Sequence, residues 1–489
     1  MDQKFLLPSS ADVRRPDRFA LVDSDDEEVH FWDLLTAILR SESAPIVDIP
    51  SFIQALETIA VTLRGTASDM DFGLLREFMS RHEEEEPTSR KLFPEIWPAL
   101  VDIALAMPSL FPEGTLPSLS STRDGGVSEA VFSRKQIACL VVHQFLCSLP
   151  PHPWPTESFF DLHPWYSMSS TVHRGAVDAY LTALFTYFGR LCRSAEDQQS
   201  PLSFSIEEWP IVFTMRTMTD QEVDKIEVDQ AKEVMMSSTH VDIVNLSQSQ
   251  TAPPFHGLPD GACVISANKC IGYGPSGTQE ELNTGISPEA YPAVLLAPPL
   301  SDKQVLICRG AEAMASIHGY GRDAKLAEAF RKPSPSPSDS LQWKNRTMLF
   351  MDALELDVLP VAGDSLIPDI YPSSRLFRDM ILKAYNAFSS ETYSHIVTGL
   401  WGCGTFGGNR YIKCILQWCA AALAGIRVLR FVFATSEQRL FGEEFATFVT
   451  KVQRNCIAVK QMFDLLTSLS SIHEIGPDGI FTFIADQIR

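Results

Sequence analysis

Positive charge is scarce in this chain: its 489 residues include 40 Lys and Arg against 61 Asp and Glu, a formal net charge of −21. A protein that binds along the phosphates of a nucleic acid needs a basic surface. The composition therefore predicts no direct nucleic-acid partner, although an anionic ligand can still bind in one local pocket. Hydrophobic residues make up 45% of the chain, enough for a sizeable core, so we expect a globular protein.

Clustered cysteines and long apolar runs are also missing. The ten cysteines form no CxxC pair and no His/Cys spacing typical of a metal site, and the first residues lack a secretory signal pattern. These absences predict an intracellular protein, and without a strong basic localisation run they do not distinguish the nucleus from the cytoplasm. The longest apolar stretch, Ile415–Ala424, is shorter than the ~20 residues that cross a bilayer. It predicts a buried helix and no membrane role.

The spacing of apolar residues along the sequence changes near residue 205. Before that point, apolar residues recur at helical spacing in Phe31–Leu39, Phe72–Met79 and Val177–Phe188. After it, short apolar segments alternate with helical ones, a pattern typical of an α/β domain. The predicted strands are Trp209–Phe213, Ala262–Ser266, Val305–Cys308, Met348–Met351, Ile396–Thr398 and Val428–Phe433.

Two domains are expected from this change. We predict a helical accessory domain over residues 1–205 and an α/β domain over residues 206–489. Two segments within the second domain have the composition of surface insertions or linkers: residues 247–254, and the Pro/Ser-rich stretch near 332–340.

The most informative stretch is the glycine-rich loop Gly272–Thr278, which runs straight into Gln279-Glu280-Glu281. Glycine lets the backbone turn tightly and approach a ligand, and a carboxylate at that point can transfer a proton during bond cleavage. A short apolar strand precedes the loop and a helix is predicted from Gln279, an order that suggests hydrolysis of a phosphorylated, sugar-like substrate. A second interpretation stays open, because Thr278 and Glu281 also match a capping box, in which the Glu does no chemistry.

Three segments together resemble the poly(ADP-ribose) glycohydrolase family. Ala267–Glu281 contains an Ala-Asn-Lys segment, a glycine loop and Gln-Glu-Glu, Thr398–Gly408 resembles the family's other ligand loop, and Ser133–Cys147 resembles part of its helical N-terminal region. The resemblance covers most of the chain from about Leu116 onward. It implies a macrodomain-like α/β/α catalytic core preceded by a mostly helical region. It also implies an enzyme that hydrolyses ribose–ribose O-glycosidic bonds in poly(ADP-ribose) and releases ADP-ribose, with no metal or cofactor. Its partners would be the polymer and the proteins that carry it.

A site for this polymer needs a carboxylic acid beside the glycosidic oxygen, backbone N–H groups for the diphosphate and aromatic rings for the adenine. By resemblance, Glu281 is the general acid and base, while Glu280 orients the ribose hydroxyls with Gln279 in support. The other residues implied for substrate binding are Asn268, Gly272, Gly274, Tyr320, Gly402, Gly404, Phe406, Gly407 and Phe433. The resemblance places Asn268 at the ribose, and Tyr320 and Phe433 at the adenine. A turn role for Asn268 and a core role for Phe433 remain open alternatives.

Some positions depart from the family pattern. The loop before Gln279 is shorter than usual, and Tyr273 replaces the middle glycine although tyrosine adopts a positive φ less readily. Ile265, Leu400 and Ala434 replace other residues of the pattern, and each such change removes a polar contact worth ~1 kcal/mol. These departures put affinity in question more than the reaction, because the Gln-Glu-Glu is intact. The alternative to an enzyme is an ADP-ribose-binding module with weak or no hydrolase activity. We expect a monomer in either case.

Overall fold

The computed structural model describes residues 4–66, 68, 70–85, 92–120, 125–192, 209–228, 234–245, 256–330, 342–356, 374–469 and 476–488. The insertions predicted at 247–254 and 332–340, and the domain boundary predicted at residue 205, lie outside these residues.

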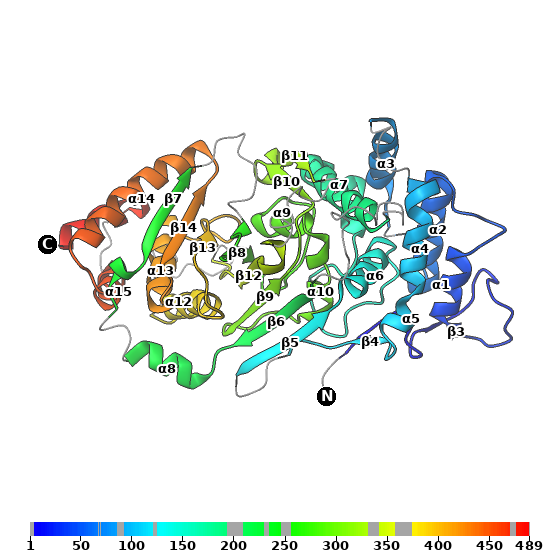
Figure 1. Ribbon diagram of the computed structural model, residues 1–489, viewed down its shortest axis with the longest axis horizontal. Helices are drawn as coiled ribbons and strands as arrows, with labels where there is room; N and C mark the ends of the chain where they lie inside the picture. Colours follow the sequence, from blue (N-terminus) through cyan, green and yellow to red (C-terminus); the bar gives the residue numbers. More distant parts are fainter. Residues whose placement is uncertain are drawn as a thin grey trace.

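A mixed eight-stranded sheet, in the order β5-β6-β9-β12-β8-β13-β14-β7, forms the centre of the molecule (Figure 1). The five strands from β12 to β7 run parallel, whereas β5, β6 and β9 pair antiparallel with their neighbours. The strands are β5 Gly126–Phe132, β6 Ile211–Thr217, β9 Gln304–Arg309, β12 Thr347–Asp352, β8 Ala262–Ala267, β13 Ile396–Thr398, β14 Val428–Phe433 and β7 His240–Asn245. All six predicted strands are present. The sequence pattern did not reveal β5, β7 and the small hairpin of β10 (Ala315–His318) and β11 (Lys325–Ala329).

The central strands are buried on both faces, because successive side chains of a strand point to opposite sides. On β12, Met348 and Phe350 join the core cluster shared with the helical region, whereas Leu349 and Met351 join the cluster on the other face. The sheet is therefore a layer between two helical layers. This confirms the predicted α/β/α architecture.

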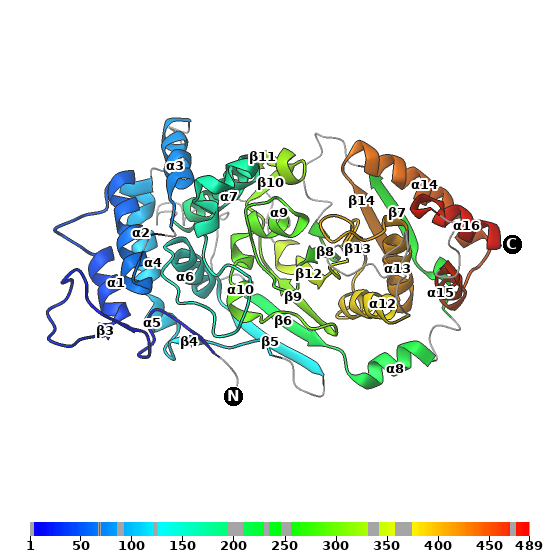
Figure 2. The same ribbon diagram turned by 180° about the vertical axis from the view of Figure 1, so that it is seen from behind.

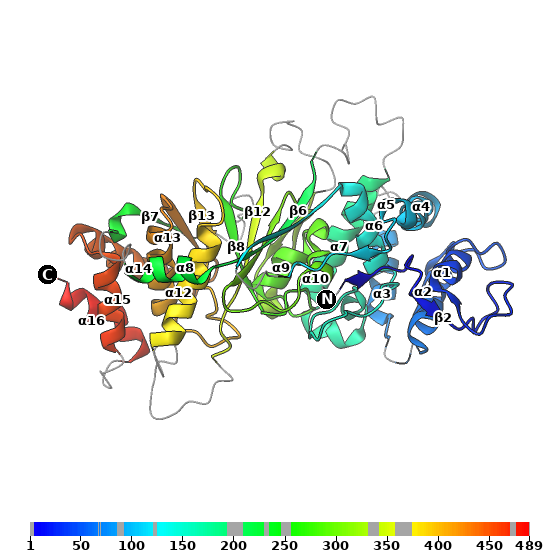
Figure 3. The ribbon, with the colours of Figure 1, turned by 90° about the horizontal axis from the view of Figure 1, so that it is seen from below.

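The first helices of the chain lie at one end of the molecule and the helices of residues 436–487 lie at the other (Figures 1 and 3). The N-terminal group contains α1 Phe31–Leu39, α2 Ile49–Arg64, α3 Gly73–Glu85, α4 Trp97–Leu105, α5 Met107–Leu110, α6 Arg134–Phe145 and α7 Arg174–Leu191. Later helices are α8 Asp220–Val228, α9 Gln279–Gly285, α10 Ala293–Leu296, α12 Ser374–Phe388, α13 Arg410–Leu423, α14 Ser436–Arg454, α15 Val459–Ser468 and α16 Ile480–Gln487. The rear view shows α14 and α16 side by side at the C-terminal end (Figure 2). No helix of the described residues is long and apolar enough to cross a membrane.

The helical region and the sheet share one core. Strand β5 lies within the predicted N-terminal domain and yet forms the edge of the main sheet next to β6. A buried ionic network adds to this connection: Arg134 of α6 pairs with Glu289 through two hydrogen bonds of 2.6 and 2.8 Å, and Arg190 of α7 pairs with Glu312 at 2.6 Å. Because these ion pairs are buried and bridge distant segments, they hold the helical region in a defined position against the core.

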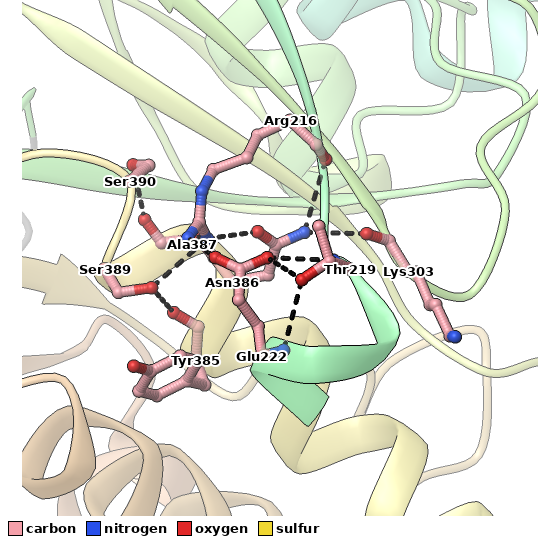
Figure 4. Close-up of polar contacts among 9 residues, drawn as sticks. All are labelled: Arg216, Thr219, Glu222, Lys303, Tyr385, Asn386, Ala387, Ser389 and Ser390. Atoms are coloured by element: carbon pink, nitrogen blue, oxygen red, sulfur yellow. Dashed lines mark hydrogen bonds and ion pairs between the residues drawn. The ribbon is translucent and has the colours of Figure 1, made fainter. Parts of the chain in front are cut away.

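A second polar cluster attaches the end of α12 to the sheet (Figure 4). Arg216 of β6 donates through Nη1 to the carbonyl oxygen of Asn386, at 2.7 Å, and through Nη2 to Glu222 Oε1, at 3.1 Å. Asn386 Nδ2 in turn donates to the carbonyl oxygen of Lys303, at 2.8 Å. Thr219 and Glu222 form the cap of α8 in the same place, with the Thr219 N–H 2.8 Å from Glu222 Oε2. The cluster joins β6 and α8, which are neighbours in the sequence, to α12; Arg216 and Asn386 are 170 positions apart.

Candidate functional site

The glycine loop connects β8 directly to α9, as the sequence predicts. Strand β8 ends at Ala267 and α9 begins at Gln279. The Gln279 side chain docks onto the end of the strand: its Oε1 accepts from the Ser266 N–H at 2.6 Å and its Nε2 donates to the Val264 carbonyl at 2.9 Å. These bonds extend the hydrogen bonding of β8 and fix the start of α9, and with it the two glutamates that follow.

Glu280 points inward and is 7% exposed. Its Oε2 accepts from the Asn268 N–H at 2.9 Å, and its Oε1 accepts from the Gly272 N–H at 3.0 Å. Burial raises the pKa of Glu280 to about 8, although these two N–H groups act in the opposite direction. Glu280 therefore holds the loop on both sides and carries its proton through the neutral range.

The raised pKa of Glu280 has a consequence for stability. Its folded-state pKa of about 8 lies above the ordinary value of 4.5, so the folded state binds more protons than the unfolded state between these values. Stability contributed by this proton is present below pH 4.5 and declines as the pH rises towards 8, on the order of a few kcal/mol in total. We expect Glu280→Gln, which cannot ionise, to remove this decline. Urea unfolding of both proteins at pH 5 and pH 8 measures it, and parallel pH dependences would contradict the assignment.

Glu281 faces the cavity and also caps its own helix. Its Oε2 accepts from the Thr278 N–H at 2.9 Å, which completes a capping box with the Thr278 hydroxyl. The Ser276 hydroxyl lies 2.8 and 2.7 Å from the two carboxylate oxygens. A Cβ at Gly274 would lie only 2.3 Å from Glu281 Oε1, so a larger residue there would displace the carboxylate from this position. Glu281 therefore does cap α9, as the second interpretation of the sequence held. Its carboxylate also lies where it can act on a ligand in the cavity.

Asn268 has the turn role that the sequence analysis gave as an open alternative. Its Oδ1 accepts from the Cys270 N–H at 2.9 Å, while its Nδ2 lies 3.4 Å from Glu355 Oε1. Since its side chain also lines the cavity, the turn geometry places the residue where a ligand can reach it.

The second glycine loop follows β13 and precedes α13, the predicted order. Gly402 and Gly407 have φ of 72° and 69°, values that favour glycine. Within the described part of the chain, the backbone N–H groups of Gly404, Thr405 and Phe406 donate to no protein acceptor. The N–H groups of Tyr411 and Ile412 at the start of α13 are already occupied by the Asn409 side chain. The loop therefore offers free donors for an anion.

Tyr320 lies on the β10–β11 hairpin and is close to both glycine loops. Its side chain is 47% exposed, and its hydroxyl lies 3.1 Å from the position that a Cβ would take at Gly404. Burial raises the pKa of Tyr320, and the nearby charge of Glu281 raises it further. The Gly321 N–H donates to the Gly277 carbonyl at 2.9 Å, which ties the hairpin to the first glycine loop. Tyr320 thus lies between the acid and the candidate diphosphate loop.

Phe433 does not reach the cavity. Its side chain is completely buried, with its ring 5.8 Å from that of Phe441. A Cβ at Gly442 would lie 2.6 Å from the Phe433 ring, so the residue is enclosed by α14. The structure thus places Phe433 in the core, the alternative that the sequence left open, because the alternation of β14 turns this side chain away from the loops. Gly407 also lies outside the cavity lining and serves the turn of its loop.

Tyr273 is the largest departure from the expected loop, and the helical region accommodates it. Its side chain is 2% exposed, its hydroxyl accepts from Gln144 Nε2 at 2.8 Å, and its ring lies 5.3 Å from that of Trp165. Trp165 Nε1 also donates to the Gly274 carbonyl at 3.0 Å. No positive φ is needed at Tyr273, so the tyrosine anchors the loop without backbone strain. Three residues that position the loop were not predicted from the sequence: Gln144, Trp165 and Ser276. Of these, Ser276 alone could have been found from the local sequence, because its hydroxyl lies five residues before Glu281.

These elements surround one cavity of about 1560 Å³. Ten of the twelve predicted site residues line it: Asn268, Gly272, Gly274, Gln279, Glu280, Glu281, Tyr320, Gly402, Gly404 and Phe406. Among the described residues, no group of three or more His, Cys, Asp or Glu side chains has the arrangement of a metal site. The cavity therefore combines two carboxylic acids, unpaired backbone donors and an aromatic ring.

Comparison with known proteins agrees with this arrangement. The family description of the macro-domain fold of poly(ADP-ribose) glycohydrolase matches residues 256–440, and that of its helical domain matches residues 84–205. Poly(ADP-ribose) glycohydrolase 1 of Caenorhabditis elegans is 26% identical over 64% of this chain and 37% of its own length. Poly(ADP-ribose) glycohydrolase 2 of the same organism is 28% identical over 46% of this chain and 47% of its own length, so the chain spans less than half of either worm protein. The probable poly(ADP-ribose) glycohydrolase 2 of Arabidopsis thaliana is 22% identical over 69% of this chain and 71% of its own length. With both the helical and the macro-domain parts matched around this site, the chain belongs to the poly(ADP-ribose) glycohydrolase family.

Proposed function

We propose that this protein hydrolyses the ribose–ribose O-glycosidic bonds of poly(ADP-ribose), including polymer carried by proteins, and releases ADP-ribose. The observation that carries the proposal is the pair of adjacent acids at the start of α9. Glu280 is buried and held by two backbone N–H groups, while Glu281 faces a large cavity beside Tyr320. Neighbouring residues of a helix point about 100° apart, so two distinct roles follow from the geometry.

In this proposal Glu281 is the general acid and base. It protonates the departing ribose oxygen as the glycosidic bond breaks and an oxocarbenium-like centre develops at the anomeric carbon. The resulting carboxylate then takes a proton from the water that adds to this carbon, which restores the acid. The Ser276 hydroxyl, within 2.8 Å of both carboxylate oxygens, holds the side chain in place during both steps.

The other parts of the cavity bind and orient the substrate. Glu280, whose pKa is raised by burial, can exchange a hydrogen bond with a ribose hydroxyl without placing a second negative charge beside Glu281. The N–H groups of Gly404, Thr405 and Phe406 suit the diphosphate, whose negative charge they can share. Tyr320 offers the adenine or the adjoining ribose an exposed ring face.

Release of ADP-ribose from purified poly(ADP-ribose) tests the function. We expect the wild-type protein to release free ADP-ribose, measured by chromatography, as the polymer shortens. The matched control is the polymer incubated with heat-inactivated protein. If the protein binds the polymer but leaves it intact, the hydrolase proposal is overturned in favour of an ADP-ribose-binding module.

A further inference from the structure

Arg346, which directly precedes β12, is a buried cation with one unused edge. Its side chain is 1% exposed, and its Nη1 donates to Ser287 Oγ at 2.8 Å and to the Ala311 carbonyl at 3.0 Å. Its Nε and Nη2 are equally buried but have no hydrogen-bond partner among the described residues. Burial lowers the pKa of Arg346 to about 10, so the guanidinium keeps its charge near neutral pH. Buried donors without an acceptor are costly, above all on a charged group.

Arg134 shows how this protein satisfies the same edge of another buried guanidinium. Its Nε and Nη2 donate to the two carboxylate oxygens of Glu289, at 2.6 and 2.8 Å, while its Cζ lies 4.6 Å from the ring centroid of Trp209. Arg346 has the tryptophan half of this arrangement, with its Cζ 5.4 Å from the ring centroid of Trp343. Two parallel N–H groups of this kind match the two oxygens of a carboxylate. Arg346 therefore presents an edge suited to a carboxylate, and none of the described side chains supplies one.

His256 lies next to this edge and also lacks partners. Its side chain is 2% exposed, and both of its ring nitrogens are buried without a hydrogen bond to any residue that the structure describes. Its ring centroid lies 5.4 Å from that of Trp343, the same ring that Arg346 covers. Burial lowers the pKa of His256 well below its ordinary value, and the charge of Arg346 lowers it further. The neutral imidazole therefore has one N–H to donate.

These residues are connected both to the cavity and to the helix that carries the two acids. His256 and Cys263 line the cavity, together with Asn283 of α9. Ser287 Oγ, which accepts from Arg346, donates to the Asn283 carbonyl at 2.8 Å. A small ligand can therefore reach His256 from the cavity, and it would lie at the end of α9 opposite the acids.

We propose that Arg346 and His256 form a binding site for a small carboxylate ion, of the size of formate or acetate. The two carboxylate oxygens accept from Nε and Nη2 of Arg346, and one of them also accepts from the N–H of His256. A planar anion with two oxygens matches this edge better than a spherical halide does. The site is separate from the acid pair and goes beyond the proposed hydrolysis, on which it does not depend.

Urea unfolding in sodium formate tests the site, with sodium chloride replaced by formate at constant ionic strength. An anion that binds one site of the folded state alone should lower the unfolding equilibrium constant about tenfold for each tenfold rise in formate above its Kd. We expect this dependence in the wild-type protein and its loss in Arg346→Lys, because an ammonium keeps the charge but lacks the two parallel N–H groups. Arg309→Lys is the matched control, since Arg309 is 40% exposed and pairs with Glu391 at the surface. It should respond to formate as the wild type does.

A second variant covers the case in which Arg346→Lys does not fold. His256→Phe keeps the ring size and the guanidinium but loses the N–H, and should raise the Kd for formate about tenfold, the loss expected for a hydrogen bond to a charged group. An unchanged Kd in His256→Phe would overturn the site. So would a wild-type protein that does not respond to formate, or an equal response in Arg346→Lys, which would be a general salt effect. Because unfolding requires no turnover, the result is independent of whether the protein cleaves poly(ADP-ribose).

Discussion

Replacing Glu281 by Gln is expected to lower kcat for the release of ADP-ribose by about 10²–10⁴-fold, the usual contribution of a proton-transfer group. Affinity for ADP-ribose should stay within a few-fold of wild type, because the side chain keeps its size. The reason for choosing Gln lies in the structure: Glu281 Oε2 accepts from the Thr278 N–H, and a Gln oxygen can accept the same bond. The variant thus keeps the helix cap and loses the proton. Turnover measured on purified polymer, together with ADP-ribose binding by calorimetry, separates the two effects.

Two control variants make this experiment decisive. Glu281→Ala removes both the cap and the acid, and should cost about 1 kcal/mol of stability in addition to activity. Glu443→Gln, on the exposed face of α14, makes the same chemical change away from the cavity and should have wild-type activity. If Glu281→Gln turns over polymer at the wild-type rate while Glu281→Ala is merely less stable, Glu281 is only a cap and the acid must be sought elsewhere.

Replacing Glu289 by Ala is expected to lower the free energy of unfolding by about 3–5 kcal/mol. Arg134 and Glu289 are 1% and 0% exposed, and they share two hydrogen bonds of 2.6 and 2.8 Å. The Glu289 carboxylate also accepts from the Glu312 N–H at 3.0 Å. Removing it leaves a buried guanidinium with less compensation and a buried N–H without its acceptor. Denaturant unfolding measured by circular dichroism and by tryptophan fluorescence checks the loss.

The control for this change is an exposed ion pair. Glu437 is 80% exposed and lies 2.8 Å from Arg410, so Glu437→Ala should cost ~1 kcal/mol or less. The double variant Arg134→Met/Glu289→Leu should recover much of the lost stability, because it replaces a buried pair with apolar groups of similar size. A loss for Glu289→Ala no larger than that for Glu437→Ala would show that the network contributes little.

Much of the fold follows from local pattern. The six predicted strands are present because each is a short apolar segment bounded by turn residues, and such segments are stable only inside a sheet. Strand β5 escaped prediction since it lies at the edge of the sheet, where Val127 and Val131 are 66% and 54% exposed. It pairs with β6, which follows it in the chain only after α6 and α7, so local sequence gives no sign of this pairing.

The candidate site also has some features that follow from local sequence and others that depend on distant segments. The order of strand, glycine loop and acid pair, and the capping box at Thr278, are local properties that can be predicted from the spacing of neighbouring residues. Which of two adjacent glutamates is buried was decided by the tertiary structure, because burial depends on what packs around the side chain. Tyr273 has a place in the core because Gln144, 129 residues away, and Trp165 surround it. Phe433 turns into the core because α14 covers that face of β14. Spacing along the chain sets which residues are neighbours on a loop or helix, whereas solvent exposure and the pKa values that follow from it arise only once distant segments have come together.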